Sequence, residues 1–298
     1  MGMIRLKSVV IYKEKENFTL KADFYHTKQA NAPVVVYIHG GGLLWGTREE
    51  IQMDMVQIYT ENGFSVFSID YRLAPETKLP DIIEDIKDAL TWIETEGPKQ
   101  FSIDPQKIAV VGSSAGAFLA LCTGMFHHNK PRAIVSFYGY GDITGKWATA
   151  SSKFYSQKAI VPKETAKRLA SNQIITEGSV EERFLLYLYA RQSGEWIQEI
   201  TGINPLIHKE QLDKFCPVQN ITKDYPPTLL LHGTKDVDVP YEQSVFMRAA
   251  LVKQGVTAKL ITIPNGEHVF DKDLQNPVVQ NALKQVVEFL KKHLAEGE

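Results

Sequence analysis

One short stretch has the residue types and spacing of a nucleophile site. Gly112, Ser114 and Gly116 form a Gly-x-Ser-x-Gly pattern after a predicted strand at 107–111 and before an apolar segment. Where a strand turns sharply into a helix at such a pattern, the serine lies at the apex of a strained turn. The positive end of the helix below it favours developing negative charge. Ser114 is therefore the candidate nucleophile, and a small-residue turn without chemistry is the alternative.

A serine hydroxyl needs a base and an orienting carboxylate before it can attack a carbonyl at neutral pH. In chains built around this turn, the acid follows the nucleophile and the histidine comes last, both in loops after late strands. Among the eight histidines, His268 follows a predicted strand and lies in a polar loop that contains Gly266. We therefore predict that His268 is the base, and an ordinary loop histidine is the alternative.

Two carboxylates compete for the role of the acid. Asp236 and Asp238 both lie in the loop between the predicted strand that ends at His232 and a predicted helix that begins near Tyr241. Asp236 lies midway in the loop, where the chain can fold back towards the last strand, and we prefer it. Asp238 lies next to the helix, where a carboxylate can cap the first turn. We therefore expect Asp238→Asn to lower stability rather than activity.

A serine hydrolase also needs backbone N–H groups aimed at the oxyanion that forms on the carbonyl oxygen. Gly41 and Gly42 follow a buried strand predicted at 33–38, and Ala115 begins the helix after the nucleophile. These three residues are the predicted oxyanion donors. Phosphate binding by the glycine-rich loop is the alternative, but the chain has neither the full P-loop pattern nor the dinucleotide fingerprint.

The elements that must position these groups alternate along the chain. Apolar runs predict eight strands, at 4–13, 18–26, 33–38, 64–69, 107–111, 133–138, 227–232 and 258–263. Apolar residues at helical spacing predict helices at 49–62, 80–96, 241–254 and from 276 onwards. Such alternation predicts an α/β fold with a mostly parallel sheet covered on both faces, and the short connection between the first two strands predicts an antiparallel edge.

The alternation stops between residues 142 and 225, where no strand is predicted. We interpret this stretch as an inserted helical cap with helices at 162–171, 180–192 and 204–209, because a structureless loop of this length is implausible. The chain then divides into a first core part at 1–141, the cap at 142–225 and a second core part at 226–298. Leu43, Tyr140 and Trp147 are predicted to line the substrate pocket, and packing is the alternative for the cap aromatics.

Composition excludes several classes of partner. The net charge of −2 offers no electrostatic basis for binding nucleic acid or an anionic membrane. No apolar run is long enough to span a membrane, and the start of the chain lacks the apolar core of a signal peptide, so we expect a cytoplasmic protein. The two cysteines have no metal-ligand spacing, and no cofactor or metal is predicted. A small-molecule ester is the expected partner, and a homodimer is left open.

The motifs together resemble the α/β-hydrolase fold, and in particular the hormone-sensitive-lipase group of carboxylesterases. They comprise His-Gly-Gly-Gly at 39–42, Asp-Tyr-Arg-Leu-Ala-Pro-Glu at 70–76, Gly-Ser-Ser-Ala-Gly at 112–116 and the two loops around Asp236 and His268. The resemblance implies Ser114, Asp236 and His268 as the catalytic triad and Gly41, Gly42 and Ala115 as the oxyanion hole. It also implies that His39 supports the oxyanion loop and that residues 70–76 hold that loop from beneath.

Two departures from the family pattern limit what the resemblance implies. The family usually has Asp before the nucleophile, where this chain has Ser113, and His39 comes too early to leave room for a large N-terminal cap. The expected function is a cofactor-free serine carboxylesterase that cleaves small or short-chain esters through an acyl-enzyme. An amide-directed hydrolase, of the kynurenine-formamidase or acyl-peptide-hydrolase kind, uses the same machinery. A ligand-binding relic of the fold is the alternative from another class.

Overall fold

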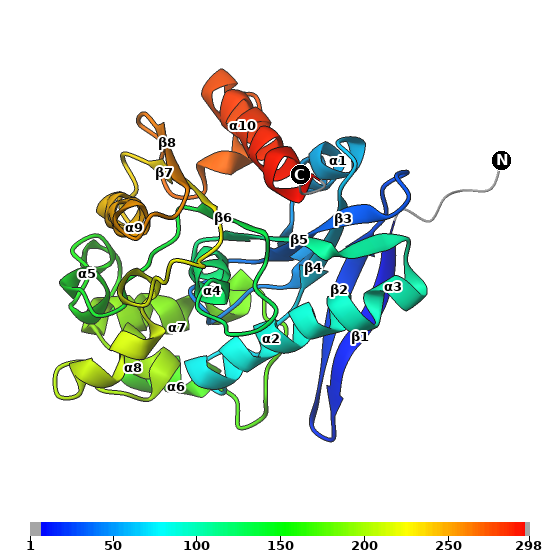
Figure 1. The fold of residues 1–298 in the computed structure, drawn as a ribbon. Coiled ribbons are helices and arrows are strands. Elements are labelled where there is room, and N and C mark those ends of the chain that lie inside the picture. Colours follow the sequence, from blue (N-terminus) through cyan, green and yellow to red (C-terminus); the bar gives the residue numbers. More distant parts are fainter. Residues whose placement is uncertain (1–6, 296–298) are drawn as a thin grey trace.

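A single eight-stranded sheet organises the computed structural model, which describes residues 7–295 (Figure 1). Its strands lie in the order β1-β2-β4-β3-β5-β6-β7-β8, with β1–β2 and β2–β4 antiparallel and the other pairs parallel. The predicted α/β class and the antiparallel edge are confirmed. The strands are β1 Lys7–Lys15, β2 Phe18–Tyr25, β3 Ala32–Ile38, β4 Ser65–Ile69, β5 Ile103–Ser113, β6 Ala133–Phe137, β7 Thr228–Gly233 and β8 Ala258–Ile263. Residues 4–6 of the first predicted strand lie outside the described residues.

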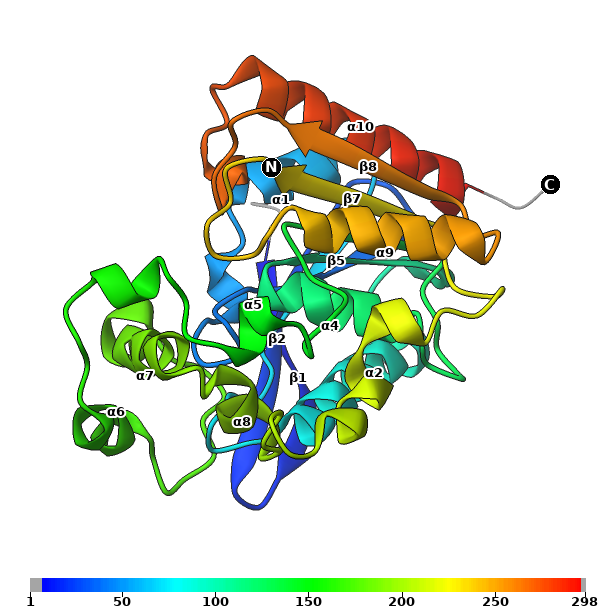
Figure 2. The same ribbon diagram turned by 90° about the vertical axis from the view of Figure 1, so that its left-hand side faces the viewer.

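Two apolar cores, one on each face of the sheet, hold the helices. Along β3, Val34 and Val36 belong to one core and Val35 to the other, because side chains alternate across a strand. The helices α1 and α10 cover the face of Val35, and α2, α4 and α9 cover the opposite face (Figures 1 and 2). The helices of the core are α1 Met53–Glu61, α2 Leu79–Thr95, α3 Gly97–Gln100, α4 Ala115–Thr123, α9 Glu242–Lys253 and α10 Pro277–Leu294.

Residues 142–225, which we call the inserted segment, lie between β6 and β7 and contain four helices among 3₁₀ turns. These are α5 Lys146–Thr149, α6 Lys163–Leu169, α7 Val180–Ser193 and α8 Trp196–Thr201. The prediction of a helix at 204–209 was wrong. Leu206 and Ile207 are exposed there, so no apolar face packs, and the Asn204 side chain accepts the N–H of Leu206 in a turn. Helix α8 was not predicted; it lies between Gly194 and Gly202, and both of these glycines have a positive φ.

Helix α7 is anchored to the core by a buried arginine near its start. Arg183 forms a two-pronged ion pair with Glu76, at 2.6 Å from Nη2 to Oε2 and 3.1 Å from Nη1 to Oε1. Its Nη2 also donates to the carbonyl of Ala74 and its Nε to the carbonyl of Leu44. Paired, bidentate geometry of this kind is what makes a buried guanidinium tolerable. The inserted segment is thus tied both to Leu44, just after the glycine-rich loop, and to the motif at 70–76.

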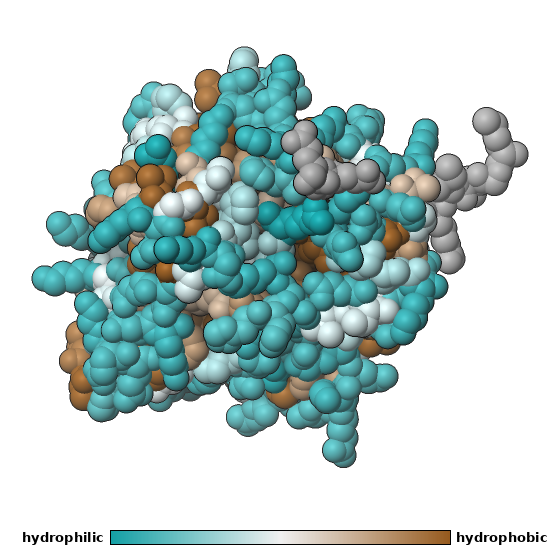
Figure 3. Space-filling model, in the orientation of Figure 1, coloured by the Kyte–Doolittle hydropathy of each residue, from teal (hydrophilic) through white to brown (hydrophobic). Residues whose placement is uncertain are grey.

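The surface carries no single dominant apolar area on the face in view. Figure 3 shows a mostly hydrophilic face on which apolar side chains lie in small separate patches. Within residues 7–295, no helix combines the length and the hydropathy that crossing a membrane would require.

Candidate active site

Ser114 lies at the turn between β5 and α4 with φ 53° and ψ −118°, a conformation that is costly for a residue with a side chain. The flanking glycines explain how the chain tolerates the turn. A Cβ on Gly112 would lie 2.2 Å from the carbonyl oxygen of Gly116, and a Cβ on Gly116 would lie 2.1 Å from that of Ile38. Only glycine allows the strand, the turn and β3 to approach this closely.

The structure brings the three residues predicted as a triad into one hydrogen-bonded chain. His268, in the loop after β8, has its Nε2 at 3.0 Å from Ser114 Oγ. Its Nδ1 lies 2.7 Å from Oδ2 of Asp236, in the loop after β7. The strands β5, β7 and β8 are parallel to one another within the sheet, so the loops after their carboxyl ends meet at one edge.

Asp236 is held on both of its oxygens. Oδ1 accepts the backbone N–H groups of Asp238 and Val239, each at 2.9 Å. Oδ2 faces His268, and the buried ring of His232 lies 3.3 Å away through its Nε2. Burial alone would raise the pKa of Asp236, but the hydrogen bonds with His232 and His268 outweigh it and hold that pKa below its ordinary value of 3.8. The carboxylate is therefore fixed and charged at neutral pH.

The contact that lowers the pKa of Asp236 raises the pKa of His268. Burial alone would lower the pKa of His268. The hydrogen bond with Asp236 and the negative charges of Asp238, Asp236 and Asp271 outweigh burial and raise the pKa above its ordinary value of 6.5. An imidazole with this pKa is a better proton acceptor, provided that the pH is high enough to keep it neutral.

Asp238 does not have the capping role that we expected from its position in the sequence. The first turn of α9 has no side-chain cap, and its N-cap residue is Tyr241. Instead, Oδ1 of Asp238 accepts the hydroxyl of Tyr187 at 2.6 Å and lies 3.1 Å from Nη1 of Arg191, both on α7. The expectation was wrong because the inserted segment, not the helix that follows, supplies the partners of this carboxylate.

The glycine-rich loop after β3 turns in conformations that side chains avoid. Gly41 has φ +97° and Gly42 has φ +60°, and a Cβ on Gly41 would lie 2.0 Å from the carbonyl oxygen of Trp45. Among the described residues, no protein acceptor is assigned to the backbone N–H groups of Gly41, Gly42 and Ala115. Free N–H groups beside Ser114 are the arrangement that stabilises an oxyanion.

A buried support lies under this loop. The ring of His39 stacks on Tyr71, with centroids 4.3 Å apart, and the hydroxyl of Tyr71 donates to the carbonyls of His39 and Gly40, each at 3.0 Å. Asp70 accepts the backbone N–H and the guanidinium of Arg48 at 2.7 and 2.6 Å. The motif at 70–76 therefore contacts the glycine-rich loop from the core side.

Ser114 and His268 open into a cavity of about 510 Å³, a size typical of small-molecule sites. The cavity wall includes Gly41 and Gly42, the aromatic residues Trp45, Tyr138, Tyr155, Phe184 and Tyr187, and the acidic residues Glu50, Asp238 and Asp271. Three of these aromatic residues come from the inserted segment. The sequence analysis considers the aromatic residues of the inserted segment only as a group, and it assigns no role to Trp45, Tyr138 or Asp271.

The three residues predicted to line the pocket lie elsewhere. Leu43, Tyr140 and Trp147 are not among the residues of the cavity wall. Leu43 and Tyr140 are fully buried, and Tyr140 packs edge-on against Trp147 at 5.1 Å and against Trp196 at 5.6 Å. Their apolar side chains fill the core beneath the inserted segment, which is the packing alternative for such residues.

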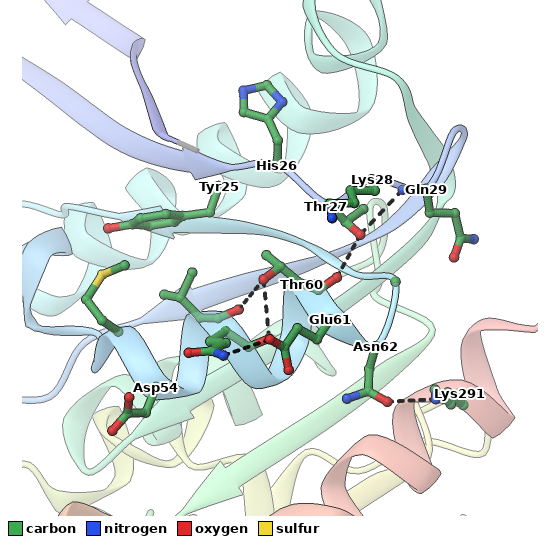
Figure 4. Close-up of a pocket in the computed structure, with 14 residues that line it drawn as sticks. Tyr25, His26, Thr27, Lys28, Gln29, Asp54, Thr60, Glu61, Asn62 and Lys291 are labelled. Atoms are coloured by element: carbon green, nitrogen blue, oxygen red, sulfur yellow. Dashed lines mark hydrogen bonds between the residues drawn. The ribbon is translucent and has the colours of Figure 1, made fainter. Parts of the chain in front are cut away.

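A second, larger hollow of about 800 Å³ lies away from the triad, between the end of β2, α1 and Lys291 of α10 (Figure 4). Some of its polar groups are hydrogen-bonded to one another. Asn62 accepts Lys291 at 2.8 Å, and Thr27 donates to the carbonyl of Thr60 at 2.8 Å. The residues that line it include no serine and no cysteine. Its two threonine hydroxyls, those of Thr27 and Thr60, donate to backbone carbonyls rather than to a base, so the smaller cavity is the candidate active site.

The sheet, the helices on both faces and the strained serine turn define a hydrolase of the α/β-hydrolase fold. The chain belongs to the BD-FAE family, whose model matches residues 22–251. The sequence-based resemblance to α/β-hydrolase esterases is thereby confirmed, with BD-FAE as the matched family.

Solved structures show the same fold over nearly the whole chain. A protein of unknown function from Staphylococcus aureus superposes with a TM-score of 0.78 at 28% identity, covering 97% of this chain and 100% of that one. An alpha/beta hydrolase superfamily protein from Enterococcus faecalis has a TM-score of 0.75 at 22% identity, covering 97% and 100%. A thermophilic esterase from Thermogutta terrifontis has a TM-score of 0.69 at 22% identity, covering 99% and 96%.

Curated relatives include parts of much larger fungal proteins. The chain is 26% identical to the non-reducing polyketide synthase ausA of Emericella nidulans, across 97% of this chain and 14% of that protein. It is 25% identical to the non-reducing polyketide synthase Preu3 of Preussia isomera, across 94% and 13%. The chain thus spans about 14% of the length of the first of these relatives.

Proposed function

We propose that this hydrolase is a serine carboxylesterase that cleaves small or short-chain esters through an acyl-enzyme. The observation that carries the proposal is the continuous chain from Ser114 Oγ to His268 Nε2 at 3.0 Å and from His268 Nδ1 to Asp236 Oδ2 at 2.7 Å, open to a cavity. This is the arrangement that activates a serine for acyl transfer.

The proposed reaction has two halves. Ser114 Oγ attacks the ester carbonyl carbon while His268 Nε2 takes its proton, and the N–H groups of Gly41, Gly42 and Ala115 stabilise the oxyanion. The tetrahedral intermediate then breaks its bond to the leaving oxygen, which receives the proton from His268. In the second half, His268 removes a proton from water, the water oxygen attacks the acyl carbon, and Ser114 leaves with the proton that His268 returns.

Hydrolysis of p-nitrophenyl acetate, combined with labelling by a fluorophosphonate, tests the proposal. We expect turnover of the ester and one covalent label per chain, located on Ser114 by mass spectrometry of a digest. A well-folded protein that neither hydrolyses the ester nor takes up the label would contradict the proposal and favour a ligand-binding relic of the fold.

The first prediction concerns pH. His268 has to be neutral to accept the proton of Ser114, so kcat/KM falls as the pH drops through the pKa of His268 in the free enzyme. Because the environment raises that pKa above 6.5, we expect half-maximal kcat/KM at a pH above 6.5. Initial rates at constant ionic strength across the acid and neutral range measure this midpoint. A midpoint below 6.5 would show that another group controls the acid limb.

A second prediction concerns the length of the acyl chain. The acyl group and the leaving group must share a cavity of about 510 Å³. Each methylene that the cavity buries gains about 0.8 kcal/mol, and a methylene that does not fit must displace protein atoms, which costs free energy. We expect kcat/KM for p-nitrophenyl esters to decline beyond about six carbons. A steady rise to long chains, or a jump on emulsified esters, would contradict this expectation.

A further inference from the structure

Asp238 is fixed in the cavity wall by a buried cation that the proposed reaction does not use. The side chain of Arg191 is buried and surrounded by the rings of Trp147, Tyr155, Tyr187 and Trp196, with its guanidinium carbon 5.0 to 5.7 Å from their centroids. Its Nη1 lies 3.1 Å from Oδ1 of Asp238, and its Nη2 donates to the carbonyl of the same residue at 3.1 Å. Aromatic faces and a carboxylate together stabilise a desolvated guanidinium.

The two oxygens of this carboxylate have different environments. Oδ1 accepts the hydroxyl of Tyr187 at 2.6 Å in addition to its contact with Arg191. Oδ2 takes no part in the contacts with Tyr187 and Arg191, and it lies 3.9 Å from Nε2 of His268. The hydroxyl of Tyr155 also interacts with this carboxylate. Because Asp238 lines the cavity, one fixed acceptor stands beside the nitrogen that handles the proton.

The position of Oδ2 relates it to one part of the substrate. His268 Nε2 delivers its proton to the departing atom, so that atom must come within hydrogen-bond distance of Nε2. A carboxylate oxygen 3.9 Å from Nε2 is then within reach of a donor on the departing atom or on the second carbon from it. A hydrogen bond to a charged acceptor is stronger than one to a neutral acceptor, so a substrate that supplies this donor gains from it.

We propose that Asp238 is a specificity-determining residue whose Oδ2 accepts a hydrogen bond from the leaving group of the substrate. The preferred leaving groups carry an N–H on the departing atom, as in an amide, or an O–H on the second carbon from it, as in a vicinal hydroxy ester. Simple alkyl esters offer Oδ2 no donor. This inference rests on the proposed function, because it assumes that Ser114 and His268 perform the acyl transfer.

The test uses three substrates that share one acyl group: ethyl acetate, 2-hydroxyethyl acetate and N-ethylacetamide. In Asp238→Asn, the amide oxygen can keep the contacts with Tyr187 and Arg191, and the amide NH₂ then replaces Oδ2 as a donor. We expect kcat/KM to fall roughly 10- to 100-fold more for a donor-bearing substrate than for ethyl acetate, as befits a hydrogen bond to a charged acceptor. A larger fall in kcat/KM for the hydroxy ester, for the amide or for both shows which donor the site accepts.

The matched control is Glu267→Gln. Glu267 is exposed and adjacent to His268 in the chain, and it does not line the cavity. The Glu267→Gln substitution removes the same charge and leaves Oδ2 of Asp238 in place. The ratios of kcat/KM among the three substrates should therefore stay as in the wild type. Retention of fluorophosphonate labelling and of the melting temperature in Asp238→Asn would show that the variant is folded.

The outcomes separate this inference from the proposed function. An equal effect of Asp238→Asn on all three substrates would overturn the specificity role while leaving the esterase proposal intact. A pH profile adds a second readout, since loss of a negative charge near Nε2 should move the acid limb of kcat/KM to lower pH. The groups that face His268 and remain in the variant are Ser114, Asp236, Tyr138 and Asp271. A wild-type protein that hydrolyses none of the substrates and takes no label would overturn both proposals.

Discussion

Replacing Ser114 by alanine is expected to abolish ester hydrolysis and covalent labelling, with kcat lower by about six orders of magnitude. The Oγ atom is the group that His268 Nε2 contacts, at 3.0 Å. Without it, only binding and the oxyanion N–H groups remain to accelerate the reaction. Ser114 is partly exposed, so the change opens no core cavity, and alanine occupies the positive-φ turn no worse than serine. Steady-state rates, intact-protein mass after labelling and thermal unfolding together measure the effect.

Ser113→Ala is the matched control, because it removes the neighbouring hydroxyl. Ser113 is buried, and its Oγ lies 3.1 Å from the hydroxyl of Tyr37 rather than near His268. We expect this variant to keep its label and most of its activity. If the Ser114→Ala protein were labelled, with the adduct on Ser113, the assignment of the nucleophile would be wrong.

The second large effect is expected for Asp236→Asn, which should lower kcat by about four orders of magnitude while leaving the fold intact. The amide oxygen can keep the two backbone N–H bonds that Oδ1 accepts from Asp238 and Val239. The amide NH₂ then points at Nδ1 of His268, which has to become the acceptor. The ring proton moves to Nε2, and Nε2 can no longer take the proton of Ser114.

Comparison with Asp238→Asn distinguishes the two acids. Oδ2 of Asp236 lies 2.7 Å from Nδ1 of His268, whereas Oδ2 of Asp238 lies 3.9 Å from Nε2. We expect the Asp238 variant to lose far less activity on ethyl acetate than the Asp236 variant does. Steady-state kcat and calorimetric melting temperatures for both variants decide the question. An inactive but stable Asp238→Asn protein beside an active Asp236→Asn protein would move the acid by two residues.

The sequence was sufficient for those parts of the fold and site that depend on local pattern. The β-branched run at β3 and the glycines around Ser114 have physical requirements that only a buried strand and a tight turn meet. The order of nucleophile, acid and histidine then limited the search for His268 and Asp236 to two loops. These residues could be named because each lies just after a strand, where parallel strands bring their loops together.

The remaining parts depend on contacts between distant segments, which local pattern does not encode. The position of Asp238 in the sequence predicts a helix cap, but in the structure Tyr187 and Arg191 of α7 contact its carboxylate. Leu43 directly follows the glycine-rich loop and Tyr140 follows β6, yet both are buried in the core. Helix α8 was missed because its six residues are too few to show a helical period, although the glycines at both ends mark its limits.

The two arginines of α7 bear on how this fold can be shortened. Arg183 pairs with Glu76 beside the glycine-rich loop, and Arg191 pairs with Asp238 beside the histidine. Removal of the inserted segment would leave both carboxylates without their cations and would also uncover them, since this segment supplies the groups that contact them. A hydrolase made by deleting residues 142–225 and joining β6 to β7 would therefore carry two unpaired negative charges, one beside the glycine-rich loop and one beside the histidine. A different insertion at this place would have to supply one cation beside Glu76 and another beside Asp238. Otherwise both carboxylates would have to be replaced by neutral residues.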